Sequence, residues 1–317
     1  MTKVNVGVIG CGFWGKNHVR VFNEIDNCNL LAVADIDGQQ ARLLGEQYRV
    51  KWHADPLKVI ENPAIDFISI CTPTITHAAI ALDAVKAGKH ILAEKPMTST
   101  SDEAKQVIAA AHKTNVYVMV GFIERFNPAV RYAEQMIKEQ TIGTPVLASA
   151  KRVSRWPIRI GDVGVVKDLA IHDIDLICHI FQNQVTQVFA SAGSLMHRHE
   201  DFANIMMQFQ GGKSAFIEAN WLTPRKIRRL IITGTEGIIQ VEYITQKVIV
   251  ENQEMMTTPF FPNAEPLKLE LEYFITSLVK DQPPTPNGED GLHALTICEA
   301  VLHSAQHQIP VNPSQTT

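Results

Sequence analysis

The sequence predicts an α/β protein that begins with a doubly wound parallel sheet and continues into an α+β domain with an open-faced, mostly antiparallel sheet. Short apolar runs alternate with helix-compatible stretches through about the first 120 residues, which is typical of parallel strands joined by right-handed crossovers. Beyond about residue 180, strand-like runs follow one another with almost no helix between them. Because 317 residues exceed one ordinary core, we expect two domains, residues 1–122 and 123–317.

The first domain contains five expected strands and the helices that connect them. The strands are residues 4–10, 29–35, 65–72, 90–96 and 116–122. Helices are expected to begin near Lys16 and Gln39 and to span His77–Lys86 and Ser101–Thr114. Stretches of roughly a dozen residues are long enough to return the chain across the sheet, so these strands can all run in parallel.

A glycine-rich turn follows the first strand. Gly10 permits the tight change of direction, Gly12 has no Cβ to block a pyrophosphate, and Gly15 lets the next helix pack closely on the strand. The second strand ends on Asp35, about twenty residues beyond the last glycine. These residues predict a dinucleotide site in a Rossmann domain, with the phosphates at the helix N-terminus. A purely structural glycine turn is the alternative.

Asp35 also indicates which dinucleotide binds. Its carboxylate can accept hydrogen bonds from the adenosine ribose hydroxyls, but it would repel a 2′-phosphate unless a cation compensated. No lysine or arginine follows Asp35 before Arg42. We therefore expect NAD rather than NADP as the cofactor.

The second domain is expected to combine two helices with a run of strands. The helices are Pro128–Glu139 and Lys167–Phe181, and the strands are residues 187–196, 202–210, 213–222, 227–235, 237–243 and 246–252. Several strands are joined by short polar or glycine-rich turns, which are typical of hairpins. Residues 255–266 and 281–290 are expected to be irregular, and a final helix runs from about Gly291 to Gln306. Since one face of this sheet is partly apolar, we expect a second subunit to cover it.

Composition excludes several classes of partner and location. The net charge of −4 gives no basic surplus, so nucleic acid is not an expected partner. The five cysteines are scattered without a Cys-x-x-Cys pair, which indicates reduced thiols in a cytoplasmic protein. The first strand begins after very few residues and no apolar stretch is long enough to cross a bilayer, so we expect neither a signal peptide nor a membrane segment.

Acidic and imidazole side chains occur on the apolar helix expected at Lys167–Phe181. Asp168, His172, Asp175 and His179 are spaced by four, three and four residues, which places them on one stripe of an α-helix. An aspartate one turn from an imidazole can orient it and raise its basicity, as a general base requires. Internal pairing is the alternative, and we assign Asp175 and His179 to it. No third metal ligand is apparent, so no metal is expected.

Lys95 lies at the carboxyl end of the strand at residues 90–96, between Glu94 and Pro96. Ligands gather at this end of open α/β sheets. A lysine there can donate a hydrogen bond to the oxygen of a reacting alcohol and stabilise developing negative charge. The alternative is a surface lysine at the end of a strand.

Several motifs, in this order, resemble the glucose-fructose oxidoreductase and inositol dehydrogenase family of NAD(P)-dependent sugar oxidoreductases. They are the glycine turn, CTPTITH, AGKHILAEKP, GFIERFNP and KDLAIHDID. The resemblance implies that Lys95, Asp168 and His172 form the catalytic set, that Lys95 and His172 also contact the substrate, and that the second domain makes the contacts of a homodimer or homotetramer. Besides Gly10, Gly12, Gly15 and Asp35, the positions it assigns to the cofactor are Phe13, Trp14, Thr72, Pro73, His77, Glu94, Lys95, Arg125 and Asn127. The chain departs from many members in its crowded approach to the catalytic helix, IGDVGVVKD.

A basic segment precedes the catalytic helix. Lys151, Arg152, Arg155 and Arg159 surround Trp156 in a chain of net negative charge. Arginine forks suit a diphosphate and an indole can stack on a ring, so Arg155, Trp156 and Arg159 are expected to bind substrate, with a solvated strand edge as the alternative. This region resembles the subgroup that oxidises the 3-hydroxyl of UDP-N-acetylglucosamine. An inositol or free-sugar dehydrogenase, and a non-catalytic redox sensor that binds a dinucleotide, are the alternative functions.

Overall fold

The computed structural model describes residues 3–156 and 162–315. The chain forms two compact units, Met1–Phe122 with Leu267–Leu292, and Ile123–Pro266 with His293–Thr317. The sequence predicts one division, after residue 122. The segment Leu267–Leu292 differs from the prediction, because it packs with the first unit and not with the second.

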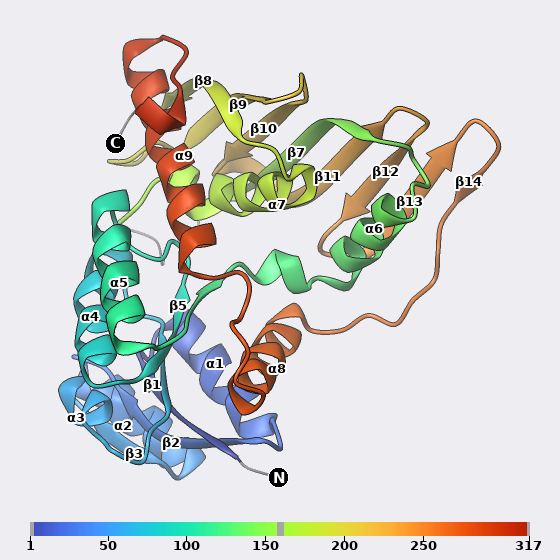
Figure 1. The fold of residues 1–317 in the computed structure, drawn as a ribbon. Helices are drawn as coiled ribbons and strands as arrows, with labels where there is room; N and C mark the ends of the chain where they lie inside the picture. The colour runs from blue at the N-terminus through green and yellow to red at the C-terminus, as the bar shows by residue number, and fades with distance from the viewer. Residues whose placement is uncertain (1–2, 157–161, 316–317) are drawn as a thin grey trace. The chain divides into compact units, whose positions relative to one another are not determined.

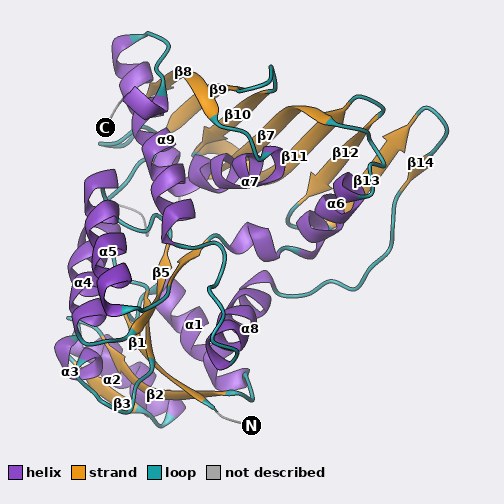
Figure 2. Cartoon of the chain, in the orientation of Figure 1, coloured by secondary structure: helices purple, strands orange, loops and turns teal. Residues whose placement is uncertain are grey.

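The first unit is built on a parallel sheet of six strands (Figures 1 and 2). The strands are β1 (Val4–Ile9), β2 (Cys28–Ala34), β3 (Lys51–His53), β4 (Phe67–Ile70), β5 (His90–Glu94) and β6 (Val118–Gly121), in the order β3-β2-β1-β4-β5-β6. All neighbouring pairs are parallel. This order reverses between β1 and β4, which is where a doubly wound sheet binds its ligand. The predicted fold class of this unit is confirmed.

The helices of the first unit follow the strands in turn. They are α1 (Phe13–Glu24), α2 (Gly38–Tyr48), α3 (Leu57–Ile60), the 3₁₀ turn η1 (Thr74–Thr76), α4 (His77–Lys86) and α5 (Ser101–Thr114). The α5 helix begins on a capping box, in which Thr100 and Glu103 satisfy each other's backbone N–H groups. Helices α4 and α5 have the predicted bounds.

Helix α8 (Pro266–Val279) was not predicted, and it accounts for the extra segment of the first unit. The ring of Phe274 packs edge-on against Phe67 of β4, with ring centroids 5.1 Å apart. The chain after α8 makes two further hydrogen bonds to this unit. The backbone N–H of Val120 donates to the carbonyl oxygen of Pro286 at 3.0 Å, and the hydroxyl of Tyr117 donates to Asp281 at 2.9 Å. Burial of this apolar helix against the parallel sheet therefore brings a C-terminal segment into the first unit.

The second unit contains an eight-stranded sheet (Figure 2). Its strands are β7 (Pro145–Arg155), β8 (Val185–Gly193), β9 (Phe202–Phe209), β10 (Ser214–Asn220), β11 (Leu222–Gly234), β12 (Gly237–Glu242), β13 (Lys247–Asn252) and β14 (Met256–Thr257), in the order β14-β13-β12-β11-β7-β10-β9-β8. Only the β7–β10 pair is parallel among the described residues. The open, mostly antiparallel sheet is confirmed, although β7 itself was not predicted.

Helices cover one face of this sheet. They are the 3₁₀ turn η2 (Ile123–Phe126), α6 (Pro128–Lys138), the π-helical segment η3 (Val166–Ala170), α7 (Ile171–Phe181), α9 (Gly288–His307, from His293 onward in this unit) and the short η4 (Pro313–Gln315). On the other face Phe189, Met206 and Phe216 are neighbours across β8, β9 and β10, and all three are exposed. None of the described helices is long and apolar enough to span a membrane.

Candidate active site

The glycine-rich turn in the first unit has the geometry of a phosphate cradle. Gly10 adopts φ +96°, a conformation that favours glycine. A Cβ on Gly15 would lie 1.7 Å from the carbonyl oxygen of Gly10, so close packing of α1 on the turn requires glycine there. A Cβ on Gly12 would meet no atom within 4 Å, and Gly12 caps α1 without a side-chain hydrogen bond. Open space therefore lies at a helix N-terminus whose N–H groups can bind a pyrophosphate.

Asp35 is bonded to this turn. Its Oδ2 accepts a hydrogen bond from the backbone N–H of Cys11 at 2.7 Å, and its Oδ1 accepts one from Asp37 at 2.9 Å. The carboxylate is half-buried at the end of β2, as the fingerprint requires. Lone pairs remain on both oxygens for ribose hydroxyls, so the residues present fit a dinucleotide such as NAD.

Of the aromatic and loop residues assigned to the cofactor, Phe13 is exposed and packs edge-on against Trp14, with ring centroids 5.6 Å apart. His77 is buried, and its two ring nitrogens lie 2.9 Å from the carbonyl oxygen of Pro96 and 2.8 Å from that of Thr72. It therefore joins the loop after β4, which includes Pro73, to the loop after β5. Direct contact of these five residues with the cofactor stays a prediction.

Glu94 is the last residue of β5, and Lys95 follows it directly. The residue that holds Glu94 was not predicted from the sequence. His18 on α1 donates from Nε2 to Oε1 of Glu94 at 3.0 Å and from Nδ1 to Oγ of Ser69 at 2.9 Å. Burial lowers the pKa of His18, but the contributions of Cys71 and Glu94 outweigh burial and leave this pKa well above its usual range. The buried stripe of α1 at Gly15, His18, Val19 and Phe22 could have revealed a polar side chain facing the sheet.

The predicted catalytic residues of the second unit lie on one continuous helical stretch. Asp168 belongs to the π-helical segment Val166–Ala170, and His172 lies in the first turn of α7. Both side chains are almost fully buried. A π-helical segment inside a helix is rare and frequently occurs at functional sites. The α-helical spacing assumed between the two residues therefore crosses an irregular segment, although both remain on the buried part of the helix.

The other two members of the predicted stripe are paired internally. Asp175 accepts hydrogen bonds from Nε and Nη2 of Arg125 at 2.8 and 2.6 Å, and His179 lies 3.2 Å from Glu134. Asn127 caps α6, because its Oδ1 accepts a hydrogen bond from the backbone N–H of Ala129 at 3.1 Å. These contacts agree with the assignment of Asp175 and His179 to internal pairing. They also engage Arg125 and Asn127, whose approach to the cofactor stays a prediction.

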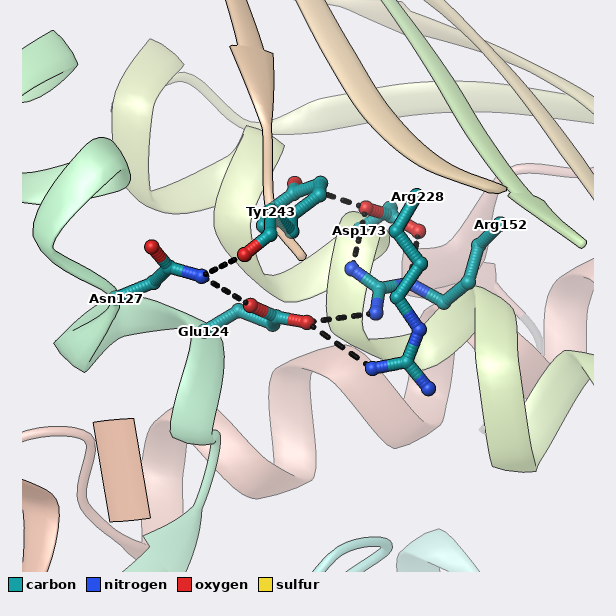
Figure 3. Close-up of polar contacts among 6 residues, drawn as sticks. All are labelled: Glu124, Asn127, Arg152, Asp173, Arg228 and Tyr243. Atoms are coloured by element: carbon teal, nitrogen blue, oxygen red, sulfur yellow. Dashed lines mark hydrogen bonds and ion pairs between the residues drawn. The ribbon is translucent and has the colours of Figure 1, made fainter. Parts of the chain in front are cut away.

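A buried ion cluster, made of Glu124, Asn127, Arg152, Asp173, Arg228 and Tyr243, lies between η2, α7 and the sheet (Figure 3). Arg152 is fully buried, and it donates to Asp173 at 2.6 and 3.0 Å and to Glu124 at 2.8 Å. Although burial lowers the pKa of Arg152, Asp173 and Glu124 raise it well above its ordinary value. The hydroxyl of Tyr243 donates to Asp173 at 3.0 Å. Arg152 was expected among the cations of the substrate segment, but it belongs to this cluster instead.

The remaining basic residues have different surroundings. Lys151 pairs with Glu218 at 2.8 Å, and Arg155, at the end of β7, is exposed. Trp156 packs against His197 and Trp221, with ring centroids 3.9 and 4.8 Å apart. Arg159 lies outside the described residues. Among the described residues, no group of three or more His, Cys, Asp or Glu side chains is arranged to hold a metal ion.

Comparison with known proteins identifies the family. A model described as an oxidoreductase family with an NAD-binding Rossmann fold matches residues 4–122, and the model of the GFO/IDH/MocA C-terminal domain matches residues 130–240. The chain belongs to the GFO/IDH/MocA family of oxidoreductases. It is therefore an enzyme of the sugar dehydrogenase type, and its cofactor is a nicotinamide dinucleotide of the NAD type.

Several members of this family resemble the chain over nearly its whole length. Myo-inositol 2-dehydrogenase of Thermotoga maritima is 28% identical, with 96% of this chain and 97% of that protein aligned. UDP-N-acetylglucosamine 3-dehydrogenase of Acidithiobacillus ferrooxidans is 27% identical, with 93% and 95% aligned. A solved structure of that dehydrogenase superposes with TM-score 0.90 at 25% identity over 97% of this chain and 99% of that one. An oxidoreductase from Agrobacterium radiobacter, solved with NAD⁺, has TM-score 0.93 at 19% identity over 100% of both chains, which shows the shared fold.

Proposed function

We propose that this protein is an NAD-dependent dehydrogenase that oxidises the 3-hydroxyl of UDP-N-acetylglucosamine to a ketone. The observation that carries the proposal is a buried aspartate and histidine, Asp168 and His172, on the helix that bears the family's catalytic motif. The third catalytic residue is Lys95, which directly follows β5 in the dinucleotide-binding unit. A protein that only sensed a dinucleotide would need none of the three.

The chemistry divides among these residues. NAD, when bound, accepts a hydride from the carbon that carries the hydroxyl. His172 removes the hydroxyl proton as the general base, and Asp168 orients the imidazole. Lys95 donates a hydrogen bond to the same oxygen and stabilises the negative charge that develops there. Gly12 and the open N-terminus of α1 bind the pyrophosphate, and Asp35 binds the adenosine ribose.

Two observations support a nucleotide sugar. Arg155 is an exposed cation at the end of β7, and Trp156, the next residue, offers an aromatic ring in the same unit as His172. A guanidinium fork suits a diphosphate, and an indole can stack on a base. The 27% identical dehydrogenase of Acidithiobacillus ferrooxidans, which acts on UDP-N-acetylglucosamine by name, supports the same choice. Arg159, which lies outside the described residues, is proposed for the same role on the basis of the sequence.

A free cyclic polyol such as myo-inositol is the second candidate substrate. Two of the four cations near Trp156 are used within the protein, because Arg152 is buried in the ion cluster and Lys151 pairs with Glu218. Fewer cations therefore remain to neutralise a diphosphate. The 28% identical relative from Thermotoga maritima, which is named an inositol dehydrogenase, favours this candidate too.

A substrate screen tests the proposal. The purified protein is mixed with NAD and with UDP-N-acetylglucosamine, other UDP-sugars, free sugars or inositols, and the absorbance of reduced nicotinamide is followed. We expect the highest kcat/KM with UDP-N-acetylglucosamine. A higher kcat/KM with myo-inositol would replace it with the second candidate, and reduction of NAD by none of them would contradict the proposed dehydrogenase.

We further propose that the exposed face of the second unit's sheet joins copies of this chain as a homodimer or homotetramer. Phe189, Met206 and Phe216 form a continuous apolar row there, which a second subunit would remove from water. Light scattering at micromolar concentration should give a multiple of the 35.3 kDa chain mass. Met206→Lys should lower that mass, and a monomeric wild-type protein would contradict the proposal.

A further inference from the structure

Two arginines lie directly opposite each other in the sheet of the second unit. Arg152 of β7 pairs with Arg228 of β11 in the antiparallel register. Both lie on the face that the helices cover, because Ala150 and Leu230, their neighbours on the same face, are buried. Like charges directly across two strands destabilise a sheet. The fold must therefore compensate two guanidinium groups at one place.

The ion cluster compensates the two arginines unequally. Arg152 has two carboxylates, since it donates to Asp173 through two bonds and to Glu124 through a third at 2.8 Å. The ring of Tyr243 lies under its guanidinium, 4.8 Å away. Arg228 reaches only the same Oε1 of Glu124, at 3.5 Å. Within the described part of the chain, this long bond is the one ion pair that Arg228 makes.

Arg228 also remains partly open. Its side chain is 27% exposed, whereas that of Arg152 is 1% exposed. Figure 3 shows that one terminal nitrogen of Arg228 is turned toward Glu124 and the other away from the five residues drawn with it. A charged group that is mostly desolvated and weakly paired costs stability, so the fold alone gives no reason to keep an arginine here.

The electrostatics of Arg228 extend to the catalytic helix. Burial and the neighbouring charge of Arg152 lower the pKa of Arg228, and Glu124, Asp173 and Asp168 oppose this decrease. The contacts of the ion cluster also connect Arg228 to this helix. Oε1 of Glu124, which Arg228 reaches, accepts from Arg152. Arg152 in turn binds Asp173, the residue directly after His172. The available donors of Arg228 lie in the same unit as the predicted general base, on the covered face of the sheet.

We propose that Arg228 binds substrate, and that its outward N–H groups donate to two hydroxyl oxygens on adjacent ring carbons of the sugar, near the hydroxyl that is oxidised. The planar fork of a guanidinium matches a pair of neighbouring oxygen acceptors, which a lysine cannot bind in the same way. The inference rests on the proposed sugar dehydrogenase activity. Arg228 then selects substrates with adjacent oxygens and contributes nothing to NAD binding.

The test compares Arg228→Met with Arg229→Met, its neighbour on the same strand. Arg229 is exposed on the opposite face, across from Lys151, and serves as the matched control. We expect Arg228→Met to raise the KM for UDP-N-acetylglucosamine, or for myo-inositol if the screen selects it, by roughly 10- to 100-fold, as for loss of a charged hydrogen bond. The Kd for NAD should not change. The Tm should stay equal or rise, because this variant removes one of the two like charges that lie opposite each other in the sheet.

Arg228→Lys and a binding measurement keep the test decisive. Arg228→Lys retains the charge beside Glu124 but loses the fork, so its KM should also rise while its Tm stays near that of the wild type. If Arg228→Met does not fold, this variant alone decides. Calorimetric titration of each variant with the sugar in the presence of NADH measures affinity without turnover, so it applies even if NAD reduction fails in the screen. An Arg228→Lys protein with wild-type KM and sugar affinity would overturn the inference while leaving the proposed function intact.

Discussion

Nε2 of His18 lies 3.0 Å from Oε1 of Glu94, and both side chains are buried. His18 lies on α1, one turn beyond the last glycine of the phosphate turn, and Glu94 is the last residue of β5, directly before Lys95. The ion pair therefore bonds the helix that begins at the cofactor turn to the strand that ends at the predicted catalytic lysine. Among the described residues, Oε2 of Glu94 has no hydrogen-bond partner, so it remains available to a ligand.

The His18–Glu94 pair predicts a specific dependence of stability on pH. Because the pKa of His18 is raised in the folded protein, its stabilising contribution is fully present below about pH 6.5 and is lost as the pH rises through the folded-state pKa. Urea unfolding of His18→Gln should show a loss of about 1–3 kcal/mol in the free energy of unfolding near pH 6. The loss relative to wild type should shrink toward about pH 10.

An exposed pair of the same residue types is the control for this measurement. His112 and Glu289 lie 3.1 Å apart, but both side chains are more than half exposed. His112→Gln should change the free energy of unfolding by less than about 1 kcal/mol at either pH, because exposed ion pairs contribute little. An equal effect of the two variants, or a His18→Gln effect that grew with pH, would contradict the assignment of a buried charged histidine.

The carboxylate of Asp35 should decide between NAD and NADP. Calorimetric titration of the wild-type protein should give tighter binding of NAD, because Asp35 repels a 2′-phosphate. Asp35→Asn keeps an oxygen that can accept the hydrogen bond from Cys11 N–H, so the turn is preserved while the charge is removed. We expect this variant to lower the ratio of the NADP dissociation constant to the NAD dissociation constant roughly tenfold.

Asp37 provides the control for the Asp35 variant. It caps α2 by accepting from the backbone N–H groups of Gln39 and Gln40, at 3.0 and 3.3 Å, and it is also acidic and close in sequence. Asp37→Asn should leave the ratio of the two dissociation constants unchanged. Equal or tighter binding of NADP to the wild-type protein would show that the interpretation of Asp35 is wrong.

The fold was predictable where one periodic pattern dominates. Alternation of short strands with helices predicted the parallel sheet, and α4 and α5 have the expected bounds. Helix α8 was not predicted although its buried residues, Leu267, Leu271 and Phe274, have helical spacing. The proline-containing segments on either side of it, residues 255–266 and 281–290, indicate irregular structure and no helix. Strand β7 was not predicted because its basic residues were interpreted as a binding segment, whereas the strand lies inside the sheet between β11 and β10.

The candidate site was predictable as a set of motifs but not as a network. Spacing located Asp168 and His172 on a buried helix, yet it gave no signal that Asp173, one position further, pairs with Arg152 of β7. Such pairs depend on how a helix packs on a sheet, which brings residues 21 positions apart into contact and which a single sequence does not encode locally. The same limit applies to Arg228, which reaches Glu124 from 104 residues away.

The basic segment predicts a difference between two classes of substrate. If Arg155 binds a diphosphate, Arg155→Ala should raise the KM for UDP-N-acetylglucosamine, with no change in the Kd for NAD. The increase in KM should correspond to the loss of about 1.5–3 kcal/mol of charged hydrogen bonding. Lys247→Ala, an exposed cation on β13, is the control and should have no effect on KM. Steady-state kinetics that show the same small effect for both variants would refute the diphosphate role of Arg155 and favour a free polyol.

The catalytic assignment predicts three variants that differ from one another. His172→Ala should lower kcat about 10²–10⁴-fold, as for loss of a general base, with little change in the Kd for NAD. Lys95→Ala should lower kcat at least as much, because it removes the donor to the reacting oxygen. Asp168→Asn should be milder, since orientation of His172 is its only role. Each kcat is measured at saturating NAD with the substrate that the screen identifies.

Binding measurements separate a catalytic effect from unfolding in these variants. The His172→Ala and Asp168→Asn proteins should keep the wild-type affinity for NAD, because both residues belong to the second unit and the phosphate turn to the first. Circular dichroism of all three variants should show the wild-type secondary structure. Asp175→Asn is the comparison on the same helix. It breaks the forked pair with Arg125, so it should lower Tm more than Asp168→Asn does while affecting kcat less. Near-normal kcat in both His172→Ala and Lys95→Ala would show that the assignment is wrong, and Asp168 and His172 would then belong to a buried polar network without a catalytic role.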